Sequence, residues 1–205
     1  MRNYHKNIPS EAITDFEDFY ERMANELPDG AVIAEIGVAC GRSAIMLAEK
    51  LSDLGKDFTL YMVDNFGYGG YKQRNEVLSH IVNSGLGNKI KLLEMSSLDA
   101  SCEFPDSHFD FCFIDSSHKL QETKAAIRLW YYKMKEDCVL AGHDYYSKEN
   151  PEVQTAVLEV IPTRYLREPI SDQQSFEPEQ LLHTEQTRNG NGVWFLKKKF
   201  YIKLN

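Results

Sequence analysis

The stretch AVIAEIGVACGRS, residues 31–43, constrains the fold more than any other part of this 205-residue sequence. Residues 31–36 form a short apolar run typical of a buried strand, and residues 42–51 carry apolar side chains at three- and four-residue steps, as an amphipathic helix does. Gly37 and Gly41 lie between them. Because a glycine turn from a strand into a helix lets free backbone amides approach a ligand closely, this stretch predicts a loop that binds a nucleotide-like molecule.

The spacing inside this loop argues against a dinucleotide. A dinucleotide-binding loop has the pattern G-x-G-x-x-G, whereas the pattern here is E-x-G-x-x-x-G, with Ala39 in the place of a middle glycine. Glu35 precedes the first glycine by two residues, and a carboxylate there repels a pyrophosphate but can pair with an ammonium group. Asp64 ends the next strand-like run, roughly 20 residues beyond the loop, where a carboxylate accepts hydrogen bonds from ribose hydroxyls.

Two more apolar runs end in acids. Residues 109–114 stop at Asp115, and residues 138–141 stop just before His143 and Asp144. Because right-handed crossovers bring the carboxyl ends of parallel strands to one edge of a sheet, we expect these side chains to share a cleft with the loop and the earlier acids. A sheet has no structural need for carboxylates there, so the pattern indicates a functional site.

Composition limits the partners. The 23 basic and 31 acidic side chains give a net charge of −8, which disfavours nucleic acid as a partner. No apolar stretch reaches the length of a membrane span, and the first residues lack the apolar core of a signal peptide. The four cysteines form no C-x-x-C pair, which indicates reduced thiols. We therefore expect a cytoplasmic protein without nucleic-acid or membrane partners, and a homo-oligomer is left open.

The length of the chain predicts a single domain. Residues 1–29 would be an N-terminal helical extension, because residues 10–26 place apolar side chains on one helical face. Residues 30–161 would form the cofactor-binding core, and residues 162–205 would add C-terminal strands and a loop.

Taken together, these motifs resemble a known family. The E-x-G-x-x-x-G loop is similar to motif I of the class I S-adenosylmethionine-dependent methyltransferases, and FIDSSH (113–118) and VLAGHDYY (139–146) resemble the macrocin-type and small-molecule O-methyltransferase group. The resemblance implies a Rossmann-like, doubly wound sheet of seven mostly parallel strands, with helices on both faces, an added N-terminal helix and a last strand, 193–196, antiparallel to the fifth. It also implies methylation of a small-molecule hydroxyl, as on a sugar or a natural product.

The resemblance also assigns residues. The set that it implies for S-adenosylmethionine is Glu35, Gly37, Val38, Ala39, Gly41, Ser43, Asp64, Asn65, Ser97 and Asp115. The catalytic set is Asp115, His143 and Asp144, with two roles open: these residues hold Mg²⁺, which suits hard oxygen ligands, or His143 is a general base. The competing functions are a nicotinamide-dependent oxidoreductase and a nucleotide-cofactor-binding protein without turnover.

Overall fold

A computed structural model describes residues 2–9, 15–67, 70–161, 182–199 and 204. Their strands form one seven-stranded sheet in the order β3-β2-β1-β4-β5-β7-β6. The strands are β1 (Ala31–Ile36), β2 (Phe58–Asp64), β3 (Ile90–Glu94), β4 (Phe109–Ile114), β5 (Met134–Gly142), β6 (Leu182–Glu185) and β7 (Val193–Lys197). The first five are parallel, whereas β7 is antiparallel to both of its neighbours. The predicted doubly wound, mostly parallel fold is confirmed, including the antiparallel strand beside the fifth.

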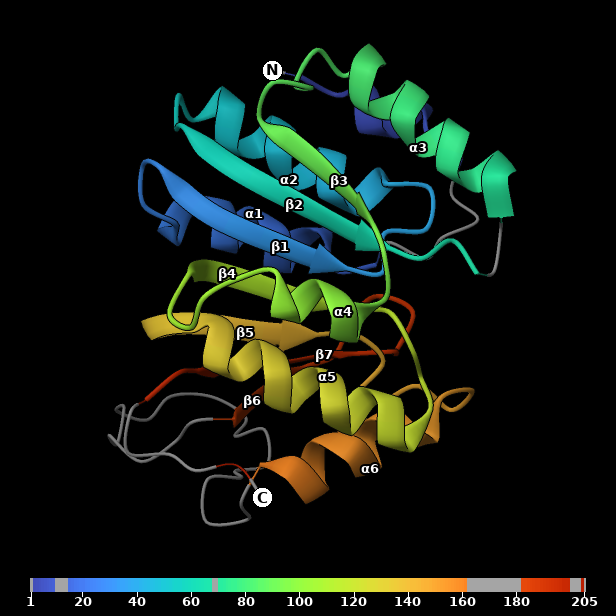
Figure 1. Ribbon diagram of the computed structural model, residues 1–205, viewed down its shortest axis with the longest axis vertical. Helices are drawn as coiled ribbons and strands as arrows, with labels where there is room; N and C mark the ends of the chain where they lie inside the picture. The colour runs from blue at the N-terminus through green and yellow to red at the C-terminus, as the bar shows by residue number, and fades with distance from the viewer. Residues whose placement is uncertain (1, 10–14, 68–69, 162–181, 200–203, 205) are drawn as a thin grey trace.

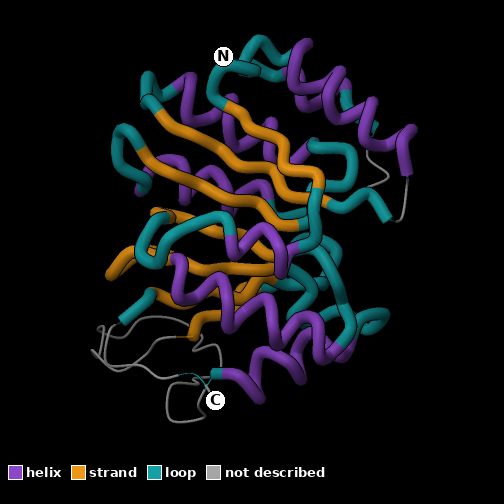
Figure 2. Tube along the Cα trace, viewed as in Figure 1, coloured by secondary structure: helices purple, strands orange, loops and turns teal. Residues whose placement is uncertain are grey.

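Helices cover both faces of this sheet, as Figures 1 and 2 show. One face packs against α1 (Glu17–Glu26), α2 (Arg42–Asp53) and α3 (Gly70–Asn83), and the other against α4 (Ser97–Cys102), α5 (Leu120–Lys133) and α6 (Pro151–Val160). A short 3-10 helix, Tyr4–Asn7, lies against α2 through a hydrogen bond from the Tyr4 backbone N–H to Glu49. Within the part of the chain that the structure describes, no helix is long and apolar enough to cross a membrane.

Strand β4 shows why the middle of the sheet is buried on both sides. All six of its side chains are buried, as expected of a central parallel strand with helices on either face. Phe111 and Phe113 pack into the core under α1 and α2, whereas Cys112 and Ile114 pack into the core under α5. Because side chains alternate along a strand, the direction of each residue at the site is fixed by its position in its strand.

Two helices differ from the sequence predictions. Helix α1 begins at Glu17, and Asp15 and Phe16 precede it in non-helical backbone; residues 10–14, where the predicted helix would begin, lie outside the described residues. Helix α4 was not predicted, because it is too short to show an apolar period. Strands β6 and β7 lie within the C-terminal part predicted to contain strands, of which 162–181 is outside the described residues.

Candidate active site

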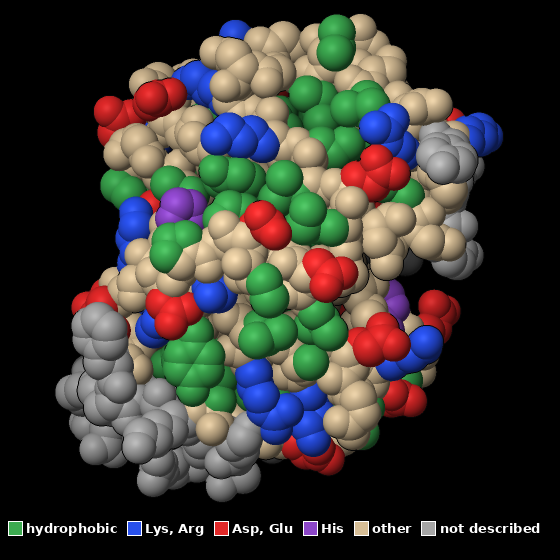
Figure 3. Space-filling model, in the orientation of Figure 1, with side chains coloured by type: hydrophobic (Ala, Val, Ile, Leu, Met, Phe, Trp, Pro, Cys, Tyr) green, Lys and Arg blue, Asp and Glu red, His purple; other side chains and the backbone are tan. Residues whose placement is uncertain are grey.

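A cleft of about 1060 Å³ opens at the carboxyl edge of the parallel strands. Figure 3 shows the molecule hollowed at its right edge, toward which the strand arrows of Figure 1 point, with a histidine and acidic side chains beside the hollow. The predicted site residues that line the cleft are Gly37, Ala39, Asp64, Asn65, Ser97, Asp115, His143 and Asp144. The structure therefore brings three of the four strand-end acids into one cleft, and the fourth, Glu35, lies elsewhere.

The loop between β1 and α2 depends on glycine at its first position. Gly37 has a φ of +86°, and a Cβ there would lie 2.1 Å from the carbonyl oxygen of Asp115 and 2.6 Å from the Cα of Ser116. These are backbone atoms, which no change of rotamer can move. Gly37 therefore lets the ends of β1 and β4 approach each other, and this approach brings Asp115 against the loop. Ala39 also has a positive φ, +46°, which costs an L-residue roughly 1 kcal/mol.

Asp64 holds this loop from the end of β2. Its Oδ2 accepts hydrogen bonds from the backbone N–H groups of Val38 (2.9 Å) and Ala39 (3.2 Å), and its Oδ1 accepts one from Phe66 (2.7 Å). An ionised carboxylate has about four acceptor positions, so one remains on Oδ1 for a hydroxyl in the cleft. The geometry is compatible with the predicted ribose contact and adds a second role, the shaping of the loop.

Glu35 points away from the cleft, toward α1 and α2. Its carboxyl group accepts hydrogen bonds from the hydroxyls of Tyr20 (2.8 Å) and Ser43, and the residue is only 2% exposed. The alternation of side chains along β1 explains this direction, because Glu35 shares a face with Ile33, which packs under the same helices. Glu35 therefore does not line the cleft. Three other residues assigned to the cofactor, Val38, Gly41 and Ser43, do not line it either.

Burial makes Glu35 a pH-sensitive group. It raises the pKa of this carboxyl to about 7, against hydrogen bonds from Ser43 and Tyr20 that lower it. The folded protein therefore binds a proton more tightly than the unfolded chain does. The contribution of this group to stability is fully present below about pH 4.5 and is lost as the pH rises through about 7.

We therefore expect Glu35→Gln to remove part of the pH dependence of folding. Relative to the wild type, the variant should gain up to about 3 kcal/mol in free energy of unfolding between pH 4.5 and 8, since each pKa unit corresponds to about 1.4 kcal/mol. Urea unfolding of both proteins at several pH values measures this difference. Parallel pH profiles would show that Glu35 ionises normally in the folded protein.

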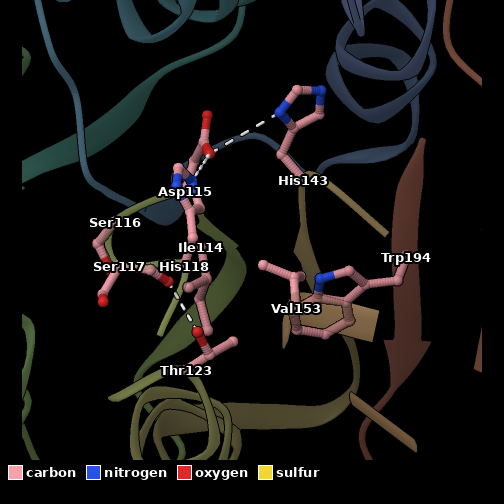
Figure 4. Close-up of a pocket in the computed structure, with 9 residues that line it drawn as sticks. All are labelled: Ile114, Asp115, Ser116, Ser117, His118, Thr123, His143, Val153 and Trp194. Atoms are coloured by element: carbon pink, nitrogen blue, oxygen red, sulfur yellow. Dashed lines mark hydrogen bonds and ion pairs between the residues drawn. The ribbon is translucent and has the colours of Figure 1, made fainter. Parts of the chain in front are cut away.

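Four side chains meet where β4 and β5 end. Nε2 of His118 lies 3.0 Å from Oδ2 of Asp144 and 3.7 Å from Oδ1 of Asp115. Nδ1 of His143 lies 3.5 Å from Oδ1 of Asp144 and 3.8 Å from Oδ1 of Asp115. Figure 4 shows His143 with one ring nitrogen turned toward Asp115. Two imidazoles therefore face two carboxylates at one end of the cleft; His118 is the member that the sequence patterns did not single out.

These contacts set the charges of the group. The nearby carboxylates of Asp115 and Asp144 raise the pKa of His118 to about 10, so its imidazole is protonated at neutral pH. Burial raises the pKa of Asp144, but the hydrogen bond from protonated His118 and the positive charge of that imidazole, together with contributions from neighbouring groups, bring the pKa below its ordinary value. The positive charge of the His118 imidazole therefore offsets part of the negative charge of the two carboxylates.

The same residues include a candidate metal-ligand set. Asp115, His118 and Asp144 offer donor atoms within 4.8 Å of one another, the one such set within the described ranges of the chain. His143, which the sequence suggested as a ligand, is not part of the set, and its Nε2 lies 2.7 Å from Oδ1 of Asp15. Two carboxylates with one imidazole suit ions such as Mn²⁺ or Zn²⁺ better than Mg²⁺, which prefers oxygen ligands.

The sequence matches one family model. This model, described as a methyltransferase domain, matches residues 34–145, which is more than half of the chain and runs from β1 to just beyond β5. No curated protein matches the sequence.

Solved structures of low sequence identity share the fold. A cofactor-bound protein from MTB, Rv0187, has a TM-score of 0.67 at 13% identity, with 95% of this chain and 86% of that chain covered. A putative caffeoyl-CoA O-methyltransferase from Staphylococcus aureus has a TM-score of 0.62 at 16% identity, with 95% and 87% covered. The calicheamicin-biosynthesis enzyme CalS11, described as a TDP-rhamnose 3'-O-methyltransferase, has a TM-score of 0.61 at 16% identity, with 93% and 81% covered.

Proposed function

The chain belongs to the methyltransferase domain family and is an S-adenosylmethionine-dependent enzyme, and we propose that it transfers the methyl group to a hydroxyl oxygen of a small polar molecule. The observation that carries this proposal is the group of two carboxylates and two imidazoles at one end of the cleft. Asp64 is the last residue of β2 and Asp144 follows β5, with β1 and β4 between these strands, a separation of about 14 Å across three strand spacings. A cofactor held at Asp64 and the glycine loop would extend along this edge toward the four side chains.

The residues at the Asp64 end of the cleft fit the ribose and the base of this cofactor. Gly37 leaves the loop backbone free of a side chain, and Asp64 keeps one acceptor position for a hydroxyl. Ser97 and Leu98 line the cleft beyond β3, where a purine ring can rest on an apolar side chain beside a hydroxyl. These contacts are our assignment for the ribose and the base.

We propose that His143 removes the proton from the acceptor hydroxyl. When bound, S-adenosylmethionine supplies a methyl group on a sulfonium sulfur, which keeps the electron pair of the broken C–S bond. The chain has to align the acceptor hydroxyl with that methyl group and remove one proton from its oxygen. His143 lines the cleft, and its Nδ1, on the side of Asp115 and Asp144, can take this proton, while the O–H electron pair stays on the oxygen for the new O–C bond.

A divalent cation is the alternative to His143. Asp115, His118 and Asp144 would hold it, and it would acidify a hydroxyl bound to it. We favour the histidine because protonated His118 already compensates the two carboxylates. The mixed donor set also makes Mg²⁺ a poorer match than an ion that accepts nitrogen ligands.

The acceptor that we propose is small, polar and not a nucleic acid. The cleft beyond the four side chains is lined by polar and acidic residues, among them Glu122, Ser147, Glu149 and Asn150. Together with the net charge of −8, these acids repel a phosphate backbone. Two of the similar structures are described as O-methyltransferases, one of them for TDP-rhamnose, which supports a hydroxyl of a sugar or a natural product.

A screen of acceptors tests the function. The purified protein is incubated with S-adenosylmethionine and panels of sugars, nucleotide sugars, phenols and amines, and the release of S-adenosylhomocysteine is measured. We expect turnover with hydroxyl compounds and a methyl ether in the product. Methylation of nitrogen or carbon alone, or oxidation of an alcohol with NAD, would contradict the proposal.

A further inference from the structure

A buried carboxylate lies directly behind His143. Asp15, just before α1, is 8% exposed, and its Oδ1 lies 2.7 Å from Nε2 of His143. Its other oxygen, Oδ2, accepts hydrogen bonds from the hydroxyl of Thr187 (2.6 Å) and from the backbone N–H of Asn189 (3.3 Å). The carboxylate of Asp15, in the N-terminal segment, therefore contacts both the end of β5 and the turn before β7.

The two nitrogens of His143 have different surroundings. Nε2 makes the short contact to Asp15, whereas Nδ1 lies 3.5 and 3.8 Å from the nearest oxygens of Asp144 and Asp115, longer than a well-formed N–H···O bond. The ring of Phe16 packs against the imidazole with centroids 4.9 Å apart, and the histidine side chain is 4% exposed. The imidazole is thus held on its Nε2 side by Asp15. Its Nδ1 is turned toward Asp115, which lines the cleft (Figure 4).

We propose that Asp15 is a positioning residue that fixes His143 with its proton on Nε2 and its Nδ1 lone pair toward the cleft. The effect of this position on catalysis rests on the proposed function. An ionised carboxylate can only accept hydrogen bonds, so Nε2 has to be the donor in this contact. The neutral ring then has its lone pair on Nδ1, where the acceptor's proton arrives. A carboxylate on the far nitrogen also stabilises the imidazolium that forms, as in other Asp–His pairs.

This support comes from outside the part of the chain that the family model matches. Asp15 precedes residues 34–145, and Thr187 and Asn189 follow them, whereas His143 lies within them. The N-terminal segment therefore contributes to the site although none of its described residues lines the cleft, whereas the turn before β7 also lines the cleft through Asn191. Their role is to decide which nitrogen of His143 reaches the acceptor.

The experiment combines spectroscopy with kinetics on the full chain. The ¹⁵N chemical shifts of the His143 ring, recorded in alkaline buffer without acceptor, identify the neutral tautomer in the wild type, Asp15→Asn and Asp15→Glu. The matched control is Asp18→Asn, the same substitution at an exposed carboxylate of α1 that pairs with Arg188. Circular dichroism and thermal unfolding check that each variant is folded.

We expect the Nε2–H tautomer in the wild type and in Asp18→Asn, and a mixture of tautomers in Asp15→Asn. The kcat of Asp15→Asn should fall about 30-fold or more with little change in the KM of the acceptor, since a misplaced proton disables the base. Asp15→Glu should recover part of that activity. An Nδ1–H tautomer in the wild type, an unchanged tautomer in Asp15→Asn, or equal losses of kcat in Asp15→Asn and Asp18→Asn would overturn the proposal.

The two proposals fail in different ways. A wild type that transfers no methyl group to hydroxyl compounds contradicts the proposed function, whereas the tautomer shifts test the Asp15 contact in the absence of any acceptor. If Asp15→Asn does not fold, Asp15→Glu carries the test: an Nε2–H tautomer with measurable turnover supports the proposal, and a switch to the Nδ1–H tautomer with unchanged turnover overturns it.

Discussion

Gly37→Ala is expected to abolish binding of S-adenosylhomocysteine. The new methyl group would lie 2.1 Å from the carbonyl oxygen of Asp115 and 2.5 Å from its carbonyl carbon, so the ends of β1 and β4 would have to separate. That separation moves the loop and Asp115 together. We expect a loss of affinity of about 100-fold or more, which corresponds to about 3 kcal/mol. Isothermal calorimetry on the folded variant measures it.

Gly30→Ala is the matched control for this substitution. Gly30 has a φ of +78°, close to that of Gly37, but no described heavy atom lies within 4 Å of the position of its Cβ. Alanine there carries only the cost of the backbone conformation, about 1 to 2 kcal/mol of stability, and should leave ligand binding unchanged. If Gly37→Ala binds the ligand as well as Gly30→Ala does, the close approach of the two strands is not required for the site.

His143→Ala is expected to lower kcat by about 100-fold or more, the usual contribution of a positioned base. Nδ1 of His143 is the nitrogen that we assign to the acceptor's proton, and alanine removes it. Binding of S-adenosylhomocysteine should change little, because the histidine lies at the other end of the cleft from Asp64. His108→Ala is the control, since His108 precedes β4 at the opposite edge of the sheet and should leave kcat unchanged.

Chelation distinguishes the mechanism with His143 as the base from the mechanism with a divalent metal ion. With His143 as the base, EDTA leaves the wild-type rate unchanged and Asp115→Asn retains part of it. If a divalent ion at Asp115, His118 and Asp144 is required instead, EDTA abolishes turnover, an added ion restores it, and His143→Ala keeps most of its activity. Activity that survives both EDTA and His143→Ala would leave alignment of the two substrates as the source of the rate.

Local patterns were sufficient for the elements that carry the site. The predicted strands at 31–36 and 109–114 coincide with β1 and β4, because a short apolar run between glycines and acids leaves few alternatives. The shared edge of the strand ends follows from the handedness of the crossovers, so Asp64, Asp115 and Asp144 could be placed in one cleft before the structure was known. Helix α4 and strand β6 are too short to give such a signal.

The directions of single side chains were harder to predict. The distance of Glu35 from the glycine loop along the sequence suggests a place at the cofactor, but a shift of one residue along a strand changes the face, and Glu35 lies on the face of Tyr20. Asp15 meets His143 across 128 residues, and no local pattern links the two. For His118 a signal did exist, since it follows Asp115 by three residues, but a histidine at the start of a helix is common without a function.

The measurement that tests the account most directly is calorimetric titration of S-adenosylhomocysteine into the wild type and Asp64→Ala, with Asp106→Ala as a surface control whose carboxylate pairs with Lys133. We expect binding by the wild type and by Asp106→Ala, and an affinity for Asp64→Ala lower by about 1 to 3 kcal/mol, because the variant loses the hydroxyl's acceptor and the contacts that shape the loop. Equal affinities in three folded proteins, or a wild type that binds NAD and not S-adenosylhomocysteine, would contradict the assignment of this cleft.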